Sequence, residues 1–274
     1  MKFPCTVGIL TFNNEDTLRR TLESVQDFDD IVICDGGSTD RTREIAREFG
    51  ARIIEQGALF KDAQGRLKDY GGVRNQCLDA ARYDWFLYVD SDETISEGLR
   101  EDIRSITAGK DGALVYKVPI GIMMDGKYLK YSSNYPGYQY RFFNRHSGAR
   151  FVKAVHERIS FDEAQVKIGT LAHPWYVHTT RDYWNHYLRE TGGYRPIEIQ
   201  NSCDAPFSLK AYLRFTLWWQ MHASLVICVK ALSNYLLHGF KEAVPPQGEL
   251  GRAAVPLVFA WNVTVCRIKK LFSN

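Results

Sequence analysis

The segment Trp85-Phe86-Leu87-Tyr88-Val89-Asp90-Ser91-Asp92-Glu93 constrains this chain more than any other stretch. Its first five residues are apolar and predict a strand buried on both faces, which runs directly into three carboxylates. Clustered carboxylates are costly to bury and repel one another, so this cluster indicates a compensating cation. Mg²⁺ and Mn²⁺ take oxygen ligands and usually bind through one or two carboxylates together with substrate phosphates. The alternative is an acidic turn without a further role, because Asp is common in turns.

The composition is that of a globular protein with an uneven charge distribution. The 274 residues suit one large domain with an appendage or two small domains. From Phe207 to the end there are eight Lys/Arg against two Asp/Glu, whereas the preceding residues carry 27 against 30. A basic, aromatic-rich tail of this kind favours an anionic surface as partner.

The N-terminus and the cysteines indicate a cytoplasmic protein. The first residues lead directly into a strand-like run and do not resemble a secretory signal. The six cysteines are scattered without a CxxC pair, so we interpret them as free core residues in a reducing compartment, neither disulfides nor zinc ligands.

The N-terminal half predicts a nucleotide-binding α/β unit. Apolar strand-like runs and helical patterns alternate over residues 6–12, 17–25, 31–34, 41–49 and 51–55. This order predicts a parallel sheet covered by helices, in which ligands bind beyond the carboxyl ends of the strands. Asp35 and the pair Asp90 and Asp92 occupy that edge. The chain contains no GxGxxG or GxxxxGK[ST] motif, which argues against a dinucleotide dehydrogenase or a P-loop NTPase.

Four ordered motifs carry a resemblance to a known family. They are Thr11-Phe12-Asn13, the DGGSTD turn from Asp35 to Asp40, Arg74-Asn75 and the VDSDE string. In this order and spacing the chain resembles a family 2 glycosyltransferase of the GT-A fold. The stretch from Tyr135 to Phe143 and the sequence Ala154-Val155-His156-Glu157 are similar to the branch that contains lipopolysaccharide-core glucosyltransferases. Together the motifs cover about residues 4–190.

The resemblance implies roles for particular residues in donor binding. Asp35 would contact the nucleobase, where a carboxylate can accept the imide N–H of uracil; the neighbouring position, often acidic in the family, is Gly36. Arg74 would lie near the diphosphate, or be a solvated helix arginine. Asp92 would bind Mn²⁺ or Mg²⁺, and Asp90 the ribose or the metal shell. The remaining nucleotide-sugar contacts are expected from Thr11, Asn13 and Glu15.

The resemblance also implies an inverting transfer, which needs one base for the acceptor hydroxyl. That base would be Glu157, with Glu93 as the second candidate; a surface ion pair of Glu157 with Arg158 or Arg150 is the alternative. His156, Tyr138 and Arg141 are expected to contact the acceptor. His178 follows the apolar run of residues 175–177 and is expected in the metal shell, although a hydrogen-bonded core histidine is the commoner case.

The predicted architecture is a GT-A catalytic domain, residues 1–205, followed by a helical C-terminal region, residues 206–274. No stretch of 18 or more uncharged apolar residues occurs, so the tail is expected to lie in the plane of a membrane interface or to pack as a cap.

We therefore expect a hexosyltransferase using a nucleotide-diphosphate sugar, such as a UDP-sugar. Its acceptor would be a saccharide, lipid-linked, in cell-envelope or lipopolysaccharide biosynthesis at the inner face of the membrane. The strongest alternative is a haloacid-dehalogenase-type phosphatase, because Asp90-Ser91-Asp92-Glu93-Thr94 satisfies its DxDxT motif, with Asp90 as nucleophile. That motif normally opens its domain, however, and no later paired-acid motif follows here. A non-enzymatic sugar- or lipid-binding protein would not need Asp35, Arg74, Asp92 and Glu157 together.

Overall fold

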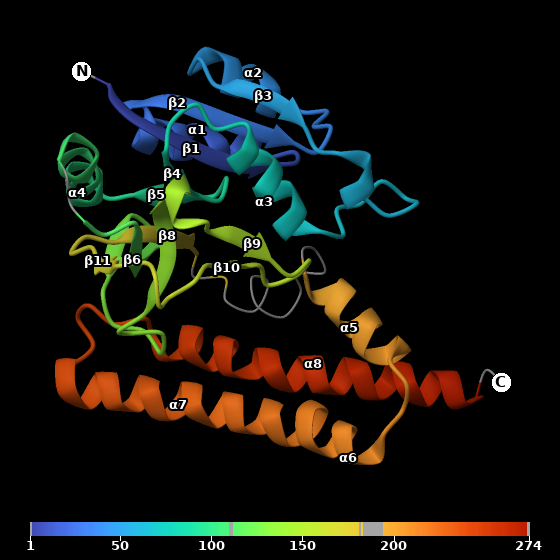
Figure 1. Cartoon of the computed structure of the whole chain (residues 1–274). Helices are drawn as coiled ribbons and strands as arrows, with labels where there is room; N and C mark the ends of the chain where they lie inside the picture. Colours follow the sequence, from blue (N-terminus) through green and yellow to red (C-terminus); the bar gives the residue numbers. More distant parts are fainter. Residues whose placement is uncertain (1, 110–111, 181, 183–193, 273–274) are drawn as a thin grey trace. The chain divides into compact units, whose positions relative to one another are not determined.

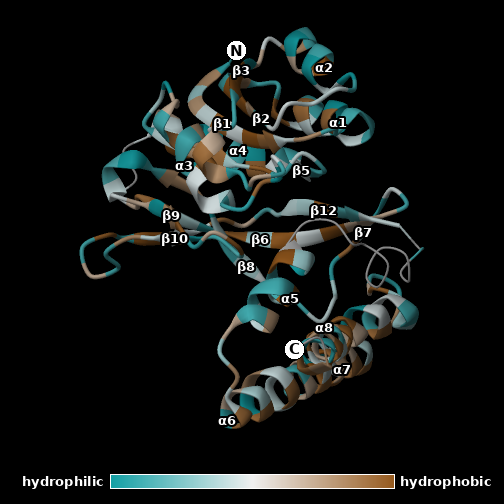
Figure 2. Cartoon of the chain, turned by 90° about the vertical axis from the view of Figure 1, so that its right-hand side faces the viewer, coloured by the Kyte–Doolittle hydropathy of each residue, from teal (hydrophilic) through white to brown (hydrophobic). Residues whose placement is uncertain are grey.

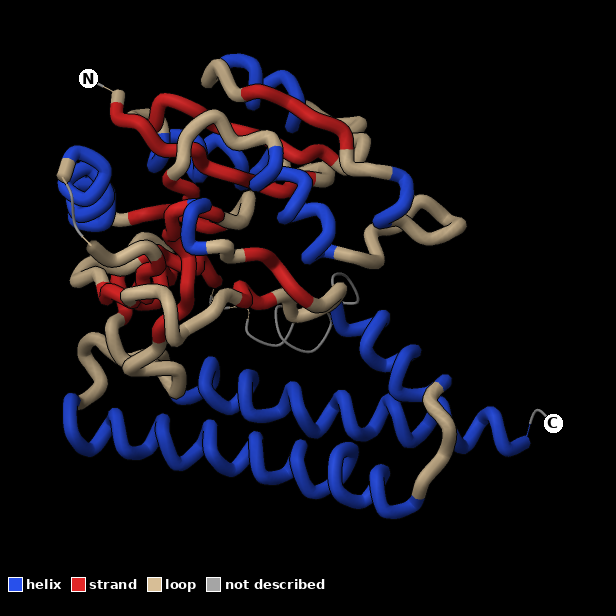
Figure 3. Tube along the Cα trace, viewed as in Figure 1, coloured by secondary structure: helices blue, strands red, loops and turns tan. Residues whose placement is uncertain are grey.

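The computed structural model describes residues 2–109, 112–180, 182 and 194–272. The chain packs as two compact units, and Figures 1 and 3 show their elements. The first unit comprises Met1–Gly121 and Gly137–His178, and the second comprises Ile122–Pro136 and Thr179–Asn274. The expected division at residue 206 stays a prediction. Residues 183–190, the end of the stretch that carries the resemblance, lie outside the described residues.

The first unit is built on a mixed sheet with the strand order β3-β2-β1-β4-β8-β6-β12-β5. Its parallel half consists of β1 (Phe3–Thr11), β2 (Phe28–Asp35), β3 (Arg52–Glu55) and β4 (Trp85–Tyr88). The other strands are β5 (Glu93–Ile95), β6 (Val115–Met124), β8 (Tyr138–Asn144), β11 (Ile168–Thr170) and β12 (Trp175–Thr179). β8 pairs antiparallel with both β4 and β6, and this pairing joins the halves. A separate antiparallel ribbon is formed by β9 (Arg150–Val152) and β10 (Arg158–Ser160).

Helices cover both faces of the parallel half. They are α1 (Glu15–Val25), α2 (Thr42–Glu48), α3 (Tyr70–Asp79) and α4 (Glu97–Ala108), with short 3₁₀ turns η1 (Ala58–Phe60) and η2 (Arg145–Ser147). Ile33 of β2 joins a core cluster with Leu22 of α1, whereas its neighbour Cys34 joins a second cluster with Val73 of α3. Successive strand side chains point to opposite faces, so α1 and α3 cover opposite sides of the sheet. The carboxyl ends of β1, β2 and β4 therefore form the edge at which a ligand site is expected.

The second unit is mainly helical. It contains the short strand β7 (Lys127–Leu129), the helices α5 (Tyr194–Asp204), α6 (Leu209–Ala211), α7 (Trp219–His238) and α8 (Pro246–Phe272), and a π-helical stretch η4 (Tyr212–Trp218) between α6 and α7. The helices α7 and α8 run antiparallel and pack side by side, as Figures 1 and 2 show. A search of the described residues finds no helix with both the length and the apolarity needed to cross a bilayer.

One expectation about the cysteines is wrong. Cys203 at the end of α5 and Cys266 on α8 form a disulfide, with their Cα atoms 6.1 Å apart. This separation lies within the usual range for disulfides. The pairing could not be read from spacing because 63 residues separate the two cysteines. The other four, Cys5, Cys34, Cys77 and Cys228, are free, and the first three are buried as expected.

Candidate active site

The turn after β4 is held in place by α1. The side chains of Phe86 and Leu87 on β4 are buried in the core, and the chain has left the sheet at Asp90. Thr21 Oγ1 lies 2.9 Å from the carbonyl oxygen of Ser91 and 2.7 Å from that of Glu93, and Arg20 donates to the carbonyl of Asp92 at 3.1 Å. These bonds occupy the backbone carbonyls of the turn. The carboxylate-bearing turn is therefore tied to α1 through its backbone.

Arg74 links two of the expected site residues. Its Nη2 lies 2.5 Å from Asp90 Oδ1, and its Nε lies 2.6 Å from Glu157 Oε1. Arg74 is only 5% exposed, and its guanidinium stacks on the Tyr88 ring at 4.8 Å. A guanidinium has five N–H donors, so these contacts leave donors for another group. The reading of Arg74 as a solvated helix arginine is therefore wrong.

Arg141 extends this arrangement to Glu93. Its Nη1 and Nη2 lie 2.5 and 3.0 Å from the two oxygens of Glu93, and its Nη2 lies 3.9 Å from Asp90 Oδ2. The guanidinium stacks on the rings of Trp175 and Tyr88 at 4.3 and 4.5 Å. Glu93 also accepts hydrogen bonds from Trp175 Nε1 and the Asp90 amide, both at 3.1 Å. Negative and positive side chains thus alternate in a row of contacts. We call these five residues the charged cluster: Glu157, Arg74, Asp90, Arg141 and Glu93.

A close backbone approach brings Glu157 to Arg74. The loop between β9 and β10 lies on the first turn of α3, where the Tyr70 amide donates to the Ala154 carbonyl at 2.8 Å. A Cβ at position 71 would lie 2.4 Å from the carbonyl oxygen of Lys153, so only glycine fits there. Glycine at position 71 thus allows the loop to approach α3 closely enough for Glu157 to contact Arg74.

The charged cluster sets the protonation of its members. Burial acts to raise the pKa of Asp90, but the positive charges of Arg74 and Arg141 outweigh it and lower that pKa. For Glu93 burial is the larger influence, and it raises the pKa despite Arg141. Burial would lower the pKa of Arg74, yet Asp90 and Glu157 raise it well above its ordinary value. Asp90 and Arg74 are therefore charged at neutral pH.

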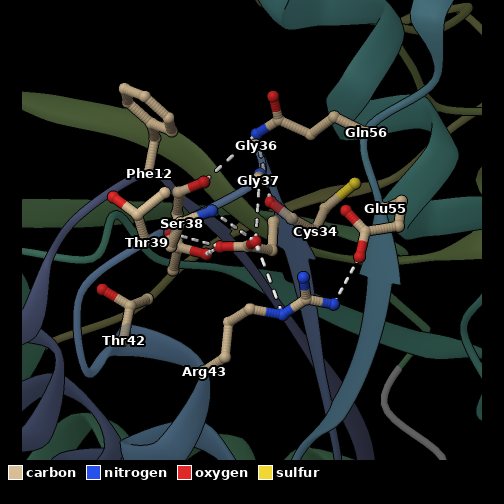
Figure 4. A network of polar contacts seen from close by, with 12 residues as sticks. Phe12, Cys34, Gly36, Gly37, Ser38, Thr39, Thr42, Arg43, Glu55 and Gln56 are labelled. Atoms are coloured by element: carbon tan, nitrogen blue, oxygen red, sulfur yellow. Dashed lines mark hydrogen bonds and ion pairs between the residues drawn. The ribbon is translucent and has the colours of Figure 1, made fainter.

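Asp35 lies at the centre of a second polar network, and Figure 4 labels three of its partners, Gly37, Ser38 and Arg43. Its carboxylate accepts four hydrogen bonds: from Thr11 Oγ1 at 2.9 Å, Ser38 Oγ at 2.6 Å, the Gly37 amide at 3.0 Å and the Ser38 amide at 2.9 Å. Burial would raise the pKa of Asp35, but the hydrogen bonds from Ser38, Thr11 and Gly37 lower it. A carboxylate has about four lone-pair sites, so these four hydrogen bonds use its capacity to accept. The Asp35 side chain therefore holds the turn in its conformation. Its expected contact with a nucleobase stays a prediction.

Asn13 and Glu15 connect the loop after β1 to the same turn. Asn13 adopts a positive φ of 53°; its amide donates to Ser38 Oγ at 2.9 Å, and its side chain accepts from the Thr39 amide at 2.8 Å. Glu15 accepts from the Arg41 amide at 3.0 Å. These two residues and Thr11 therefore lie with Asp35 at the ends of β1 and β2; their expected contacts with a nucleotide sugar stay a prediction.

The candidate metal ligands partly fit a divalent cation. The Asp92 side chain is exposed beside Asp90, and carboxylate oxygens suit Mn²⁺ and Mg²⁺. His178 Nε2 lies 2.8 Å from Thr94 Oγ1, and burial together with Arg20 lowers its pKa to about 4, which keeps the imidazole neutral. Within the part of the chain that the structure describes, no three His, Cys, Asp or Glu side chains form a metal-binding group. A cation here would therefore use Asp92 and complete its shell with substrate phosphates.

The expected acceptor residues differ in their surroundings. His156 and Tyr138 are exposed, and His156 has a positive φ of 51°. Arg141 is only 5% exposed and holds Glu93, so its expected acceptor contact stays a prediction. Sequence reasoning missed Thr21, Ser38 and Trp175. Ser38 stands within the DGGSTD turn and could have been proposed as a partner of Asp35, but Trp175 gives no local signal because it lies 82 residues from Glu93.

The fold and this site define an α/β protein with a polar ligand site at the carboxyl ends of parallel strands. The family model described as glycosyl transferase family 2 matches residues 6–161. This match covers more than half of the chain, and the chain belongs to that family. The expected GT-A fold and the expectation of a glycosyltransferase are thereby confirmed. The phosphatase alternative loses its support, because the DxDxT-like string lies inside the matched region.

Curated relatives are similar over part of the chain. An uncharacterized glycosyltransferase of Rickettsia typhi is 31% identical over 121 residues, which is 43% of this chain and 38% of that protein. The lipopolysaccharide core biosynthesis glycosyltransferase LpsC of Rhizobium meliloti is 27% identical over 117 residues, 43% of this chain and 42% of its own length. The chain thus spans about two fifths of the length of these relatives.

Solved structures show lower similarity. Staphylococcus aureus TarS residues 1–349, in complex with UDP-GlcNAc, is 13% identical, with a TM-score of 0.47 and coverage of 100% of this chain and 93% of that one. Glucosyl-3-phosphoglycerate synthase of Mycobacterium tuberculosis, in complex with Mn²⁺, UDP and glucosyl-3-phosphoglycerate, is 21% identical, with a TM-score of 0.33 and 45% coverage of each chain.

Proposed function

We propose that this protein transfers a hexose from a nucleotide-diphosphate sugar, a UDP-sugar, to a saccharide acceptor with inversion at the sugar carbon. The observation that carries the proposal is the charged cluster in a member of glycosyl transferase family 2. Arg74 and Asp90 lie together with Glu157 at the carboxyl end of β4. A buried guanidinium with unused donors suits a diphosphate, and a carboxylate beside it suits proton removal.

In this proposal the donor nucleotide lies along the ends of β1 and β2. Thr11, Asn13, Glu15 and Asp35 form the wall of that site through their hydrogen bonds with the DGGSTD turn. The DGGSTD turn, residues 35–40, offers its outer edge to the base and the ribose. Asp90 lies next to the ribose or the metal shell.

Arg74 binds the diphosphate and helps it to leave as the bond between the sugar carbon and the phosphate oxygen breaks and the acceptor oxygen bonds to that carbon. Its pKa is raised well above the ordinary value by Asp90 and Glu157, which outweigh burial, so it stays cationic throughout. Asp92 holds a Mn²⁺ or Mg²⁺ ion, which when bound would neutralise charge on the leaving group. Neutral His178 offers its second ring nitrogen to the same shell.

Glu157 takes the proton of the acceptor hydroxyl. Its side chain is 6% exposed and held by Arg74, which fixes the carboxylate in one orientation. Glu93 is less suited to this role, because both of its oxygens engage Arg141. His156 and Tyr138, both exposed, are proposed to orient the acceptor.

The acceptor is proposed to be lipid-linked, in lipopolysaccharide or other cell-envelope glycan synthesis at the inner face of the membrane. The relative LpsC is named for lipopolysaccharide core biosynthesis, and the net charge of +6 from Phe207 onward favours an anionic surface.

A panel of nucleotide sugars tests this function. Each is mixed with the full-length protein, with Mg²⁺, with Mn²⁺ or with EDTA, and both thermal stabilisation and release of nucleoside diphosphate are measured. We expect one UDP-hexose to stabilise the protein and to be hydrolysed only with metal. Absence of stabilisation and of diphosphate release across the whole panel would contradict the proposal.

A further inference from the structure

Most of the large apolar side chains that are exposed in this protein lie in the second unit. Of the 25 large hydrophobic residues exposed in the described part of the chain, 20 lie between Phe207 and Phe272. Isolated exposed hydrophobic residues are ordinary, whereas a contiguous set marks an interaction surface. Figure 2 shows the apolar character of α7 and α8.

The helix α7 turns a row of large apolar side chains toward the solvent. Leu225, Val229, Leu232 and Leu236 are 57 to 78% exposed, and their spacings of four, three and four residues place them on one face. The buried residues of α7 are Ala231 and Asn234. A helix packed in a water-soluble protein normally turns its large apolar residues inward and its polar residues outward.

The helix α8 has a similar exposed stripe. Its members are 45 to 86% exposed and recur at intervals of seven, four, seven and four residues: Leu250, Leu257, Trp261, Ile268 and Phe272. These intervals again keep the side chains on one helical face. We call the two exposed rows the apolar stripes. The α7–α8 hairpin therefore carries two long apolar rows that remain exposed within the described part of the chain.

The charges around the apolar stripes are almost all positive. Residues 207–241 contain Lys210, Arg214, Lys230 and Lys241 and no Asp or Glu. Two acidic residues follow. Glu242 is exposed, whereas Glu249 is 4% exposed and accepts a hydrogen bond from the Ser133 amide at 2.8 Å, so Glu249 adds little negative charge to the surface. Exposed cations beside exposed Leu and Trp side chains are typical of helices that lie in a membrane interface.

We propose that the α7–α8 hairpin lies in the plane of an anionic bilayer, with its apolar stripes in the headgroup–acyl boundary and its basic side chains against acidic headgroups. The inference extends the proposed function, since it would bring the transferase to a lipid-linked acceptor. A second copy of the chain fits this surface less well. Two copies pairing through α7 and the residues just before it would place the cations of both copies, Lys210, Arg214 and Lys230, in an interface whose residues 207–241 contain no Asp or Glu.

Vesicle flotation of the full-length protein tests this proposal. Vesicles of phosphatidylcholine alone and of phosphatidylcholine with phosphatidylglycerol are compared at low and high salt, without any nucleotide sugar. We expect binding to the anionic vesicles that weakens as salt rises and leaves a salt-resistant remainder from the apolar stripes. Leu236→Ser should weaken binding about tenfold, because one buried leucine is lost from the interface. Leu59→Ser is the matched control, with an equally exposed leucine on the first unit, and should leave binding unchanged.

The outcomes separate the possible occupants. Loss of flotation in Leu225→Ser/Leu232→Ser/Leu236→Ser, with an unchanged circular dichroism spectrum and thermal midpoint, supports the proposal. Full-length protein that ignores anionic vesicles at low salt overturns it. A dimer in light scattering that this triple variant converts to a monomer, without vesicle binding, assigns the surface to a second copy instead. Because no donor sugar is present, none of these results decides the glycosyl-transfer proposal.

Discussion

Arg74 Nε lies 2.6 Å from Glu157 Oε1, although 83 residues separate the two along the chain. The same guanidinium holds Asp90 through Nη2, so one arginine joins the turn after β4 to the loop between β9 and β10. Through this arginine the proposed donor side and the proposed acceptor side of the reaction share one side chain. A diphosphate that binds Arg74 therefore also changes the electrostatic environment of Glu157.

The proposed metal ligand is tested by Asp92→Ala. Without this carboxylate, the diphosphate and Asp90 lose the cation that screens them from each other, so transfer should be abolished. Thermal stabilisation by UDP should no longer depend on Mn²⁺ or Mg²⁺. Asp84→Ala, which removes another exposed carboxylate, serves as the control. Metal-dependent stabilisation that survives in Asp92→Ala would move the metal site elsewhere.

The Arg141–Glu93 pair is predicted to stabilise the fold by holding the turn that carries Asp90. Arg141→Met leaves Glu93 buried without its cation, which should cost about 3 to 5 kcal/mol of unfolding free energy. The double variant Arg141→Met/Glu93→Leu removes both charges and should be markedly more stable than the single variant. Chemical denaturation measures this difference. Equal stability of the single variant and the wild type would show that the pair contributes nothing to folding.

Asp30 is predicted to make part of the stability depend on pH. The residue is 2% exposed and accepts from Arg52 Nε at 2.8 Å, Arg52 Nη2 at 2.9 Å and Thr6 Oγ1 at 2.8 Å. Burial acts to raise the pKa of Asp30, but the hydrogen bonds from Arg52 and Thr6 outweigh it and lower that pKa.

Since the folded pKa lies below the unfolded one, this contribution is present above the unfolded pKa of about 3.9 and is lost as pH falls through the folded value. Asp30→Asn should therefore be less stable than the wild type at pH 7 and should show a shallower loss of stability between about pH 5 and pH 2. Denaturant midpoints across this range provide the measurement. Parallel curves for the two proteins would remove Asp30 from the account of acid stability.

The Cys203–Cys266 disulfide is predicted to stabilise the second unit by joining α5 to α8 across 63 residues. Cys203→Ser/Cys266→Ser should lower the free energy of unfolding by about 2 to 4 kcal/mol, the usual scale for a disulfide that closes a long loop. Cys228→Ser, at an exposed free cysteine, should change little. Thermal unfolding with and without reductant, together with a thiol count, checks this. A wild type with six reactive thiols after denaturation would show that the disulfide does not form.

The fold was predictable from the sequence where patterns are local. The runs around residues 6–12, 31–34 and 51–55 became β1, β2 and β3, and the apolar run before Asp90 became β4. Their order and the turn residues between them carry enough information for a parallel sheet with its site at the carboxyl edge. The positions of Asp35 and Asp90 at that edge follow directly from this topology.

The partners of the site residues were not predictable in the same way. Arg141 was expected to contact the acceptor, and no local pattern reports that tertiary packing also buries it against Glu93, 48 residues away. The pairing of Arg74 with Glu157 depends on a loop resting on Gly71, which no local pattern reports. The disulfide and the outward-facing leucines of α7 also depend on which helix faces pack, because spacing gives the period of a helix and not its neighbour.

The central claim is that Glu157, held by Arg74, is the base of a glycosyl transfer, and turnover of Glu157→Gln measures it most directly. The substitution keeps the size of the side chain and removes its ability to accept a proton. We predict that kcat for transfer from the matching nucleotide sugar falls by about 10² or more, the usual scale of general-base catalysis. The affinity for UDP and the thermal midpoint should stay close to those of the wild type, and Glu163→Gln, an exposed control, should be fully active. Near-normal turnover in Glu157→Gln would contradict the assignment.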